Sequence, residues 1–215
     1  MKCVTTQPDS LRCRSWRPSA LARVRSRGRL RALPFVATAA AWRYLRRMFS
    51  RWQLAHVYGM RVGGGCHLGN RIRFVYPEQI TIGDDAAVGE AVRFWSYSDS
   101  ATLRIGSGVQ VGRDSMLDFT GGLAIGENTM ISEQVLIYTY DHGYDPTSKP
   151  TASPLVIGKG AWIGARVTIL PSVRRIGDGA VIGAGAVVTH DVPDEHVFVG
   201  ARGRTIPKRE VETAS

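Results

Sequence analysis

An aliphatic or aromatic residue recurs every six positions from Val62 to Val188. The next residue is often Gly, two variable positions follow, and the fifth position is small or aliphatic, as in Ile182-Gly183-Ala184-Gly185-Ala186-Val187. A spacing of six matches neither an amphipathic helix nor an alternating strand. The recurring residues, called anchors below, group in threes: Val62/Leu68/Phe74, Ile82/Val88/Phe94, Ile105/Val111/Leu117, Ile125/Ile131/Ile137, Ile157/Ile163/Ile169 and Ile176/Ile182/Val188.

Three hexads make one coil of three short strands and three turns, so the pattern predicts an all-β solenoid of about six coils over residues 59–208. Each anchor should point inward and stack on the anchor one coil below. The Gly and small residues should occupy the corners, where the chain turns with little room. One coil buries nothing alone, and at least three are needed for a stable stack.

One corner departs from the regular count. The first anchors of successive triplets are separated by 20, 23, 20, 32 and 19 residues, against 18 for an ideal coil. The largest excess corresponds to residues 143–156, directly after His142. A solenoid corner has no structural need for so long a loop, and long loops on rigid scaffolds commonly carry function.

The N-terminal region has a different character. Residues 1–36 are rich in Arg and almost free of acidic residues, and we expect them to form a disordered basic extension. Residues 37–58 place apolar side chains three or four apart, which predicts an amphipathic helix. This helix either caps the solenoid or lies on an anionic membrane surface. Residues 209–215 form a short C-terminal tail.

The net charge of +10 belongs to this extension. Residues 1–52 contain 13 basic residues and one acidic residue, whereas the remainder contains 15 basic and 17 acidic residues. The solenoid itself is therefore not basic, and we predict no nucleic-acid partner. No apolar run reaches the ~18–20 residues of a membrane span. The three cysteines form no disulfide framework or metal-spaced pair, so we expect a cytoplasmic protein. If the N-terminal helix binds lipid, the protein would lie at the inner face of the membrane.

The run from Leu155 to Pro193 resembles the hexapeptide-repeat acyltransferases, most closely the maltose, galactoside and nodulation-factor O-acetyltransferases and their polysaccharide-modifying relatives. The resemblance rests on the six triplets, the Trp-Ile-Gly at 162–164, the Ile-Leu-Pro-Ser-Val at 169–173 and the Val-Ile-Gly-Ala-Gly-Ala-Val-Val-Thr-His-Asp-Val-Pro at 181–193. It implies a left-handed parallel β-helix, a homotrimer with sites between neighbouring prisms, and acetyl-CoA as co-substrate.

Acetyl transfer to a hydroxyl needs a base to remove the proton as the oxygen attacks the thioester, and histidine is suited to this because its pKa lies near neutral pH. The thioester is already activated, so we expect no requirement for a metal. The resemblance places the catalytic base at His142, the last residue before the long loop. It places Asp118 where relatives usually have Asn, as a group that contacts the imidazole or the acceptor; the alternative is a solvated turn residue.

The resemblance also indicates a coenzyme A groove along the later coils. Trp162 is expected to line the acetyl or acceptor site, with packing beneath the loop as the alternative. Ala165 and Ala184 are expected to give clearance to the pantetheine arm. Thr189 and His190 would lie near the nucleotide, and Arg204 would meet the phosphates, although Arg202 or Lys208 could substitute for it.

These observations predict an acetyl-CoA-dependent O-acetyltransferase acting on a sugar or glycan hydroxyl in exopolysaccharide or cell-surface glycan synthesis. An antibiotic or serine O-acetyltransferase is the first alternative, and a non-catalytic solenoid scaffold is the second. A zinc-dependent γ-type carbonic anhydrase uses the same prism, but it needs three histidines. Only His142 falls in the middle coils of this sequence.

Overall fold

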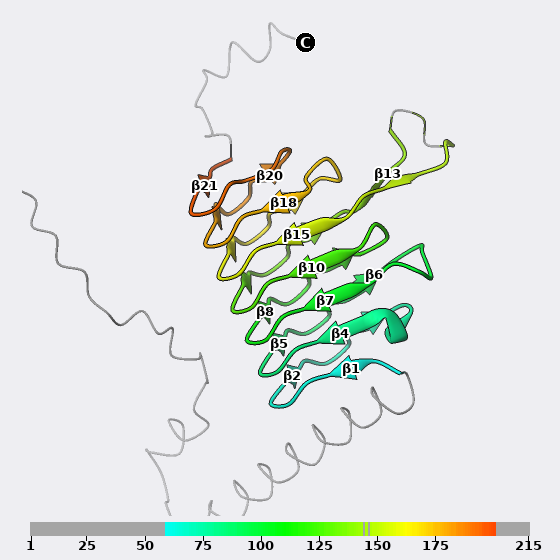
Figure 1. Cartoon of the computed structure of the whole chain (residues 1–215), viewed down its shortest axis with the longest axis vertical. Coiled ribbons are helices and arrows are strands. Elements are labelled where there is room, and N and C mark those ends of the chain that lie inside the picture. Colours follow the sequence, from blue (N-terminus) through cyan, green and yellow to red (C-terminus); the bar gives the residue numbers. More distant parts are fainter. Residues whose placement is uncertain (1–58, 144, 146, 201–215) are drawn as a thin grey trace, which may run out of the picture. The chain divides into compact units, whose positions relative to one another are not determined.

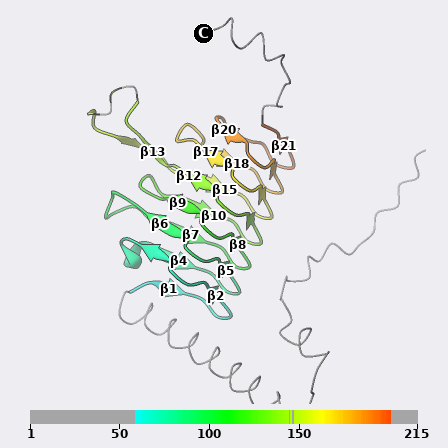
Figure 2. The same cartoon turned by 180° about the vertical axis from the view of Figure 1, so that it is seen from behind.

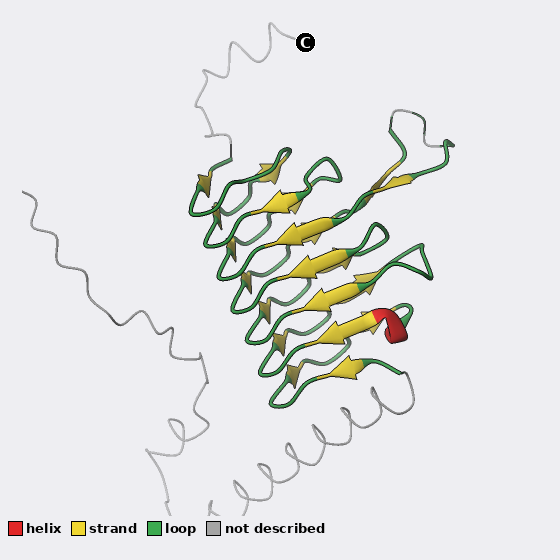
Figure 3. Ribbon diagram, viewed as in Figure 1, coloured by secondary structure: helices red, strands yellow, loops and turns green. Residues whose placement is uncertain are grey.

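The computed structural model describes residues 59–200 except residues 144 and 146, and these form a parallel β-solenoid (Figures 1 and 3). Residues 1–58 and 201–215 lie outside the described part, and with them the predicted extension, helix and tail. Short strands and turns alternate along the chain, and successive coils stack with their strands in parallel register (Figure 2).

Three parallel sheets form the faces of the solenoid. We call them the first, second and third sheet in the order in which the chain visits them. The first contains β1 (Arg61–Val62), β4 (Ile80–Ile82), β7 (Leu103–Ile105), β10 (Leu123–Ile125), β15 (Leu155–Ile157) and β18 (Arg175–Ile176). The second contains β2 (His67–Leu68), β5 (Ala87–Val88), β8 (Gln110–Val111), β11 (Met130–Ile131), β16 (Trp162–Ile163), β19 (Val181–Ile182) and β21 (Val197–Phe198). The third contains β3 (Arg73–Phe74), β6 (Arg93–Trp95), β9 (Met116–Asp118), β12 (Leu136–Ile137), β17 (Thr168–Ile169) and β20 (Val187–Val188).

The register confirms every predicted triplet. Val62 pairs with Ile82, which pairs with Ile105, and the same column continues to Ile176. The other two columns follow the predicted anchors in the same way. Anchors from the second coil onward are at most 3% exposed. Each fully buried aliphatic side chain contributes about 1.5–3 kcal/mol, so the stacked columns are the main source of stability.

The solenoid is slightly longer than the predicted six coils. After β20 the chain begins a further turn, in which Val192 bridges to Ile176 and β21 pairs with β19. The hexad is hard to recognise there because Pro193 and His196 stand where the repeat usually has its Gly and its small or aliphatic residue.

Close contact between coils explains the Gly that follows the first anchor. A Cβ added to Gly158 would lie 2.2 Å from the Asp178 carboxylate and 2.5 Å from its backbone nitrogen. No side chain fits in that space. The tight left-handed backbone occurs two residues later in the coil, where Gly160 has φ 63° and Asn128 has φ 57°.

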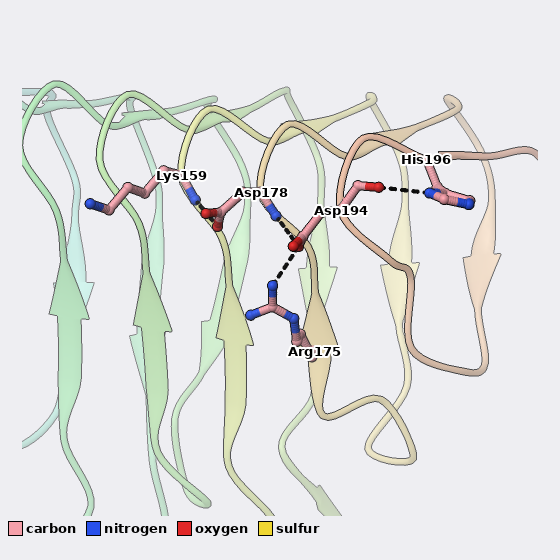
Figure 4. Close-up of polar contacts among 5 residues, drawn as sticks. All are labelled: Lys159, Arg175, Asp178, Asp194 and His196. Atoms are coloured by element: carbon pink, nitrogen blue, oxygen red, sulfur yellow. Dashed lines mark hydrogen bonds and ion pairs between the residues drawn. The ribbon is translucent and has the colours of Figure 1, made fainter.

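Three corners join the sheets. The first corner leads from the first to the second sheet, the second corner from the second to the third, and the third corner from the third back to the first. At the first corner, Asp178 Oδ1 accepts the Lys159 N–H at 2.9 Å, and Asp194 Oδ1 accepts the Asp178 N–H at 2.8 Å (Figure 4). The Arg175 guanidinium also donates to Asp194. These carboxylates therefore tie successive coils together.

The insertions gather at the third corner. The 3₁₀ helix η3 (Pro77–Gln79) lies there, as do the loop after β6 and a hairpin of β13 (Tyr140–Asp141) and β14 (Thr151–Ala152) that projects from the stack (Figure 1). The strand β15 begins at Leu155, so the last two residues of the expected loop, Leu155 and Val156, belong to the solenoid.

Candidate active site

His142 follows β13 and lies on the projecting hairpin at the third corner. The ring is exposed, and its Nδ1 lies 2.9 Å from the carbonyl oxygen of Ser148. A carbonyl oxygen can only accept, so Nδ1 carries the proton. The Ser148 hydroxyl donates in return to the His142 carbonyl at 2.5 Å. The bond to Nδ1 orients the ring and, in the neutral imidazole, leaves the Nε2 lone pair available to accept a proton, whereas the hydroxyl bond holds the backbone of His142.

The hairpin that carries His142 has its own internal bonds. Asp141 Oδ1 accepts the Gly143 N–H at 2.8 Å, so this carboxylate is turned to its own backbone. Asp145 Oδ1 accepts both the hydroxyl and the N–H of Thr147, and these bonds lower the pKa of Asp145 below its ordinary value. These bonds therefore connect described residues of the loop to one another.

Asp118 is completely buried at the end of β9, which excludes the alternative of a solvated turn residue. Its Oδ1 accepts the N–H groups of Thr120 and Thr139, both at 3.1 Å, and the Thr139 hydroxyl at 2.5 Å. Its Oδ2 accepts the Thr120 hydroxyl at 2.8 Å. Within the described part of the chain, Asp118 makes no hydrogen bond to His142. The carboxylate instead joins its own coil to the coil from which the hairpin departs.

Three aromatic side chains that the sequence analysis did not single out lie beside His142. The Tyr140 ring meets the His142 ring edge to face at 5.8 Å, Tyr97 meets Tyr140 at 5.0 Å, and Trp95 meets Tyr97 at 5.8 Å. Partial burial and a hydrogen bond to Tyr97 raise the pKa of Tyr140 to about 12. The available signal was the five-residue excess between Ile82 and Ile105, which places Tyr97 in an inserted loop.

The residues expected to contact coenzyme A lie elsewhere on the chain. Trp162 projects from the second sheet, is 51% exposed, and donates its indole N–H to the Ser132 hydroxyl at 3.2 Å. It is therefore not packed beneath the long loop. Ala165 and Ala184 lie at the second corner, where the Gly185 N–H donates to the Ala165 carbonyl at 2.8 Å. None of these three residues lies at the third corner, which carries His142.

Thr189 and His190 do lie at the third corner, after β20, where both are exposed. The Thr189 hydroxyl and His190 Nδ1 are 3.2 Å apart, and the His190 ring meets Phe198 at 5.3 Å. Arg204 lies outside the described residues, as do the possible substitutes Arg202 and Lys208. One chain therefore does not bring all the predicted site residues together.

The second corner changes along the stack in a way that suits a narrow ligand. The position two residues after its anchor holds, from the first coil to the sixth, Asn70, Glu90, Arg113, Glu133, Ala165 and Ala184. Polar and charged side chains at this position thus give way to methyl groups in the last two full coils. Trp162 lies beside this corner with an exposed face, and Arg166, at the next corner position, donates to Gln134 Oε1 at 2.9 Å.

Two general findings bear on the other expectations. Among the described residues, no three His, Cys, Asp or Glu side chains cluster in a way that could hold a metal ion. In the same part of the chain, no helix has the length and apolar character to cross a membrane.

Comparison with known proteins confirms the predicted repeat. Residues 154–190 match the family model described as bacterial transferase hexapeptide (six repeats). A protein of Staphylococcus aureus (strain MRSA252) named "Putative acetyltransferase SAR2635" is 44% identical over 64 residues, covering 30% of this chain and 32% of that protein. WbbJ of Escherichia coli K12, named for lipopolysaccharide biosynthesis and O-acetyl transfer, is 34% identical over 92 residues, covering 36% and 46%. The chain thus matches about a third of the first protein and under half of the second.

A solved structure with a similar fold is AntD, an N-acyltransferase from Bacillus cereus in complex with dTDP and 3-hydroxybutyryl-CoA. Its TM-score is 0.59 at 22% identity, covering 72% of this chain and 87% of that one. At this identity the similarity shows a shared solenoid fold.

Proposed function

We propose that this member of the hexapeptide-repeat transferases is an acyl-CoA-dependent O-acyltransferase that moves an acetyl group to a glycan hydroxyl, with His142 as the general base. The observation that carries the proposal is the bond from His142 Nδ1 to the Ser148 carbonyl. It holds the imidazole in the tautomer that a base requires, on a hairpin inserted into an otherwise regular solenoid. The similarity to WbbJ supports a glycan acceptor and a role in polysaccharide synthesis.

In this mechanism the acceptor hydroxyl lies against His142 Nε2. The thioester supplies an activated acyl carbonyl. As the hydroxyl oxygen attacks that carbonyl, Nε2 takes its proton, and Nδ1–H stays on the Ser148 carbonyl while the ring becomes positively charged. The C–S bond of the thioester then breaks, and the departing coenzyme A thiolate takes the proton from Nε2, which leaves the acyl ester, the free thiol and a neutral imidazole. Asp118 does not contact the reactants in this mechanism, but positions the base. Its carboxylate accepts the N–H and the hydroxyl of Thr139, which lies three residues before His142. The base is thereby fixed to the rigid solenoid.

The small side chains at the second corner fit the pantetheine arm of the acyl-CoA donor. A pantetheine chain is narrow and carries amides, and Ala165 and Ala184 leave room there for it to approach the backbone. Trp162 would border the acyl end. Thr189, His190 and Arg204 would meet the nucleotide and phosphates.

The separation of His142 from the predicted coenzyme A residues supports an assembly of several copies of this chain. His142 lies at the third corner, whereas Ala165, Ala184 and Trp162 lie at or beside the second. A neighbouring chain that sets its second corner against this third corner would complete the site. We therefore propose a homotrimer with sites between chains.

We also propose a left-handed winding, which the path of the coils in Figures 1 and 2 supports.

The test is a thiol-release assay with acetyl-CoA and a panel of mono- and oligosaccharides, run together with calorimetry of coenzyme A binding. We expect coenzyme A to bind and at least one glycan to accelerate thiol release above hydrolysis. Absence of turnover on every acceptor together with absence of coenzyme A binding would refute the proposal in favour of a non-catalytic scaffold.

A further inference from the structure

An exposed strip of aromatic and basic side chains leads away from His142 along the third corner. Its aromatic part is Tyr140, Tyr97 and Trp95, whose rings follow one another from the imidazole at centroid separations of 5.0–5.8 Å. Tyr140 comes from β13, Trp95 ends β6, and Tyr97 lies in the loop that follows. Figures 1 and 2 both show β13 and β6 on the same edge of the stack. The strip is thus built by two separate insertions into the repeat.

The two outer rings are exposed, they contact each other edge to face, and hydrogen bonds hold the backbone that carries them. Tyr97 is 61% exposed and Trp95 is 41% exposed. The Tyr97 N–H donates to the Thr120 hydroxyl at 3.0 Å, and the buried Ser96 hydroxyl donates to the Ser98 carbonyl at 2.8 Å. An aromatic side chain left in water forgoes the stabilisation that burial would give, and exposed apolar groups that adjoin one another typically mark a binding surface. Rings that are fixed before binding lose little entropy when a ligand stacks on them.

Two arginines extend the strip. Arg93 precedes Trp95 by two residues and projects from the same outward side of β6, about 7 Å away along the strand. Its register partner on β3 is Arg73, which is also exposed. Like charges directly opposite on neighbouring strands destabilise a sheet. Within residues 59–200, apart from the two omitted positions, neither guanidinium forms an ion pair.

The positions one residue before the anchors of the third sheet hold no acidic residue: they are Arg73, Arg93, Met116, Leu136, Thr168 and Val187. Asp118, which pairs in register with Trp95 on the neighbouring strand, is fully buried, and its carboxylate accepts hydrogen bonds from Thr120 and Thr139. By contrast, the nearby corner arginines pair with carboxylates, Arg71 with Glu90 and Arg113 with Glu133. The guanidinium pair is therefore available to an external anion.

We propose that this strip binds an acidic glycan as the acyl acceptor. A sugar ring lies on Tyr97 and Trp95, and a carboxylate or phosphate of the glycan is held by Arg93 and Arg73. The aromatic chain then directs a hydroxyl of the same glycan to His142. The last step rests on the proposed acyltransferase function, whereas binding of the glycan by the strip does not.

The test is a microarray of neutral, uronic-acid-bearing and phosphate-bearing glycans, probed with fluorescently labelled full-length protein. Wild type should bind acidic glycans, and the two acidic classes on the array identify which anion it prefers. Tyr97→Ala and Arg93→Glu should each reduce binding at least tenfold, because they remove the stacking surface and the anion partner. Tyr97→Phe should bind like wild type. Arg104→Glu is the matched charge control, since Arg104 is exposed on the first sheet.

Several results would overturn the proposal: binding to no glycan, equal binding of neutral and acidic glycans, or undiminished binding by Tyr97→Ala. A change of oligomeric state in Tyr97→Ala, seen by light scattering, would instead assign the strip to a contact between chains. His142→Ala should retain glycan binding, which separates the two hypotheses. If the array result holds while wild type shows no acyl transfer, the strip stands as a glycan site and the proposed catalytic function fails.

Discussion

Replacing Asp118 with Ala should destabilise the protein by about 2–6 kcal/mol. The carboxylate is the acceptor for the backbone N–H groups of Thr120 and Thr139. Asp118 is 0% exposed and Thr139 is 1% exposed, so water cannot replace it as the acceptor. Each buried donor left without a partner costs about 1–3 kcal/mol, and there are two. The threonine hydroxyls can rotate to other acceptors and add less.

The matched control is Asp118→Asn. An amide oxygen at the Oδ1 position keeps an acceptor for both N–H groups, and the amide nitrogen can donate to the Thr120 hydroxyl. Only the charge assistance is lost, which is worth about 1 kcal/mol per bond. We therefore expect Asn to be clearly more stable than Ala. The assay is urea unfolding followed by circular dichroism at one fixed protein concentration, because an oligomer's stability depends on concentration.

The reasoning would be refuted if the free energy of unfolding of Asp118→Ala, measured by the same assay, lay within about 1 kcal/mol of the wild-type value. If that stable variant had also lost turnover, Asp118 would act on the reactants rather than through Thr139. A destabilised Ala variant, with an Asn variant whose stability lies between those of Ala and wild type, supports the positioning role.

Three further outcomes follow from the described contacts. Gly158→Ala should destabilise by about 1–3 kcal/mol or more, measured by thermal melting, because its Cβ would meet the Asp178 backbone nitrogen at 2.5 Å; an unchanged melting temperature would contradict the packing account. Backbone N–H donors and arginine lower the folded-state pKa of Asp191 and Asp194 below that of the unfolded chain, so their stabilisation is fully present above about pH 4 and is lost as the pH falls through the lowered values. In a pH series of melts, Asp194→Asn should flatten this acid loss, and an unaltered slope would count against it. Ser148→Ala keeps the carbonyl that orients His142, so kcat should change less than about tenfold, and a loss as large as that of a missing base would show that the hydroxyl matters more than the carbonyl.

The solenoid could be predicted closely from the sequence. Its anchors are enclosed on all sides, so burial permits only aliphatic and aromatic residues at every sixth position. The additional turn was missed because Val192 and Phe198 keep the six-residue spacing, but Pro193 and His196 stand where the hexad usually has Gly and a small or aliphatic residue. The two last residues of the expected loop were misassigned for a related reason: Leu155 is a buried residue two positions ahead of an anchor, and a six-residue count does not include it.

The site was only partly predictable. The insertion made His142 the predicted base, because an insertion breaks a counting pattern, and that role stays a prediction. The partners of Asp118 could not be foreseen, since they depend on which donors of neighbouring coils meet at one corner. The aromatic strip was likewise hidden, because it joins Tyr97 and Tyr140 from different coils. The separation of Trp162 from His142 could have been foreseen, because the phase of the repeat places Trp162 on the second sheet and His142 after the third.

The central claim is that His142 removes the acceptor's proton. The most direct test is the kcat of His142→Ala in acetyl-CoA-dependent thiol release with an acceptor that wild type uses, alongside calorimetry of coenzyme A. The account predicts a kcat lowered by ~10²–10⁴ with coenzyme A affinity nearly unchanged, because only proton transfer is lost. Turnover close to wild type in this variant would contradict it.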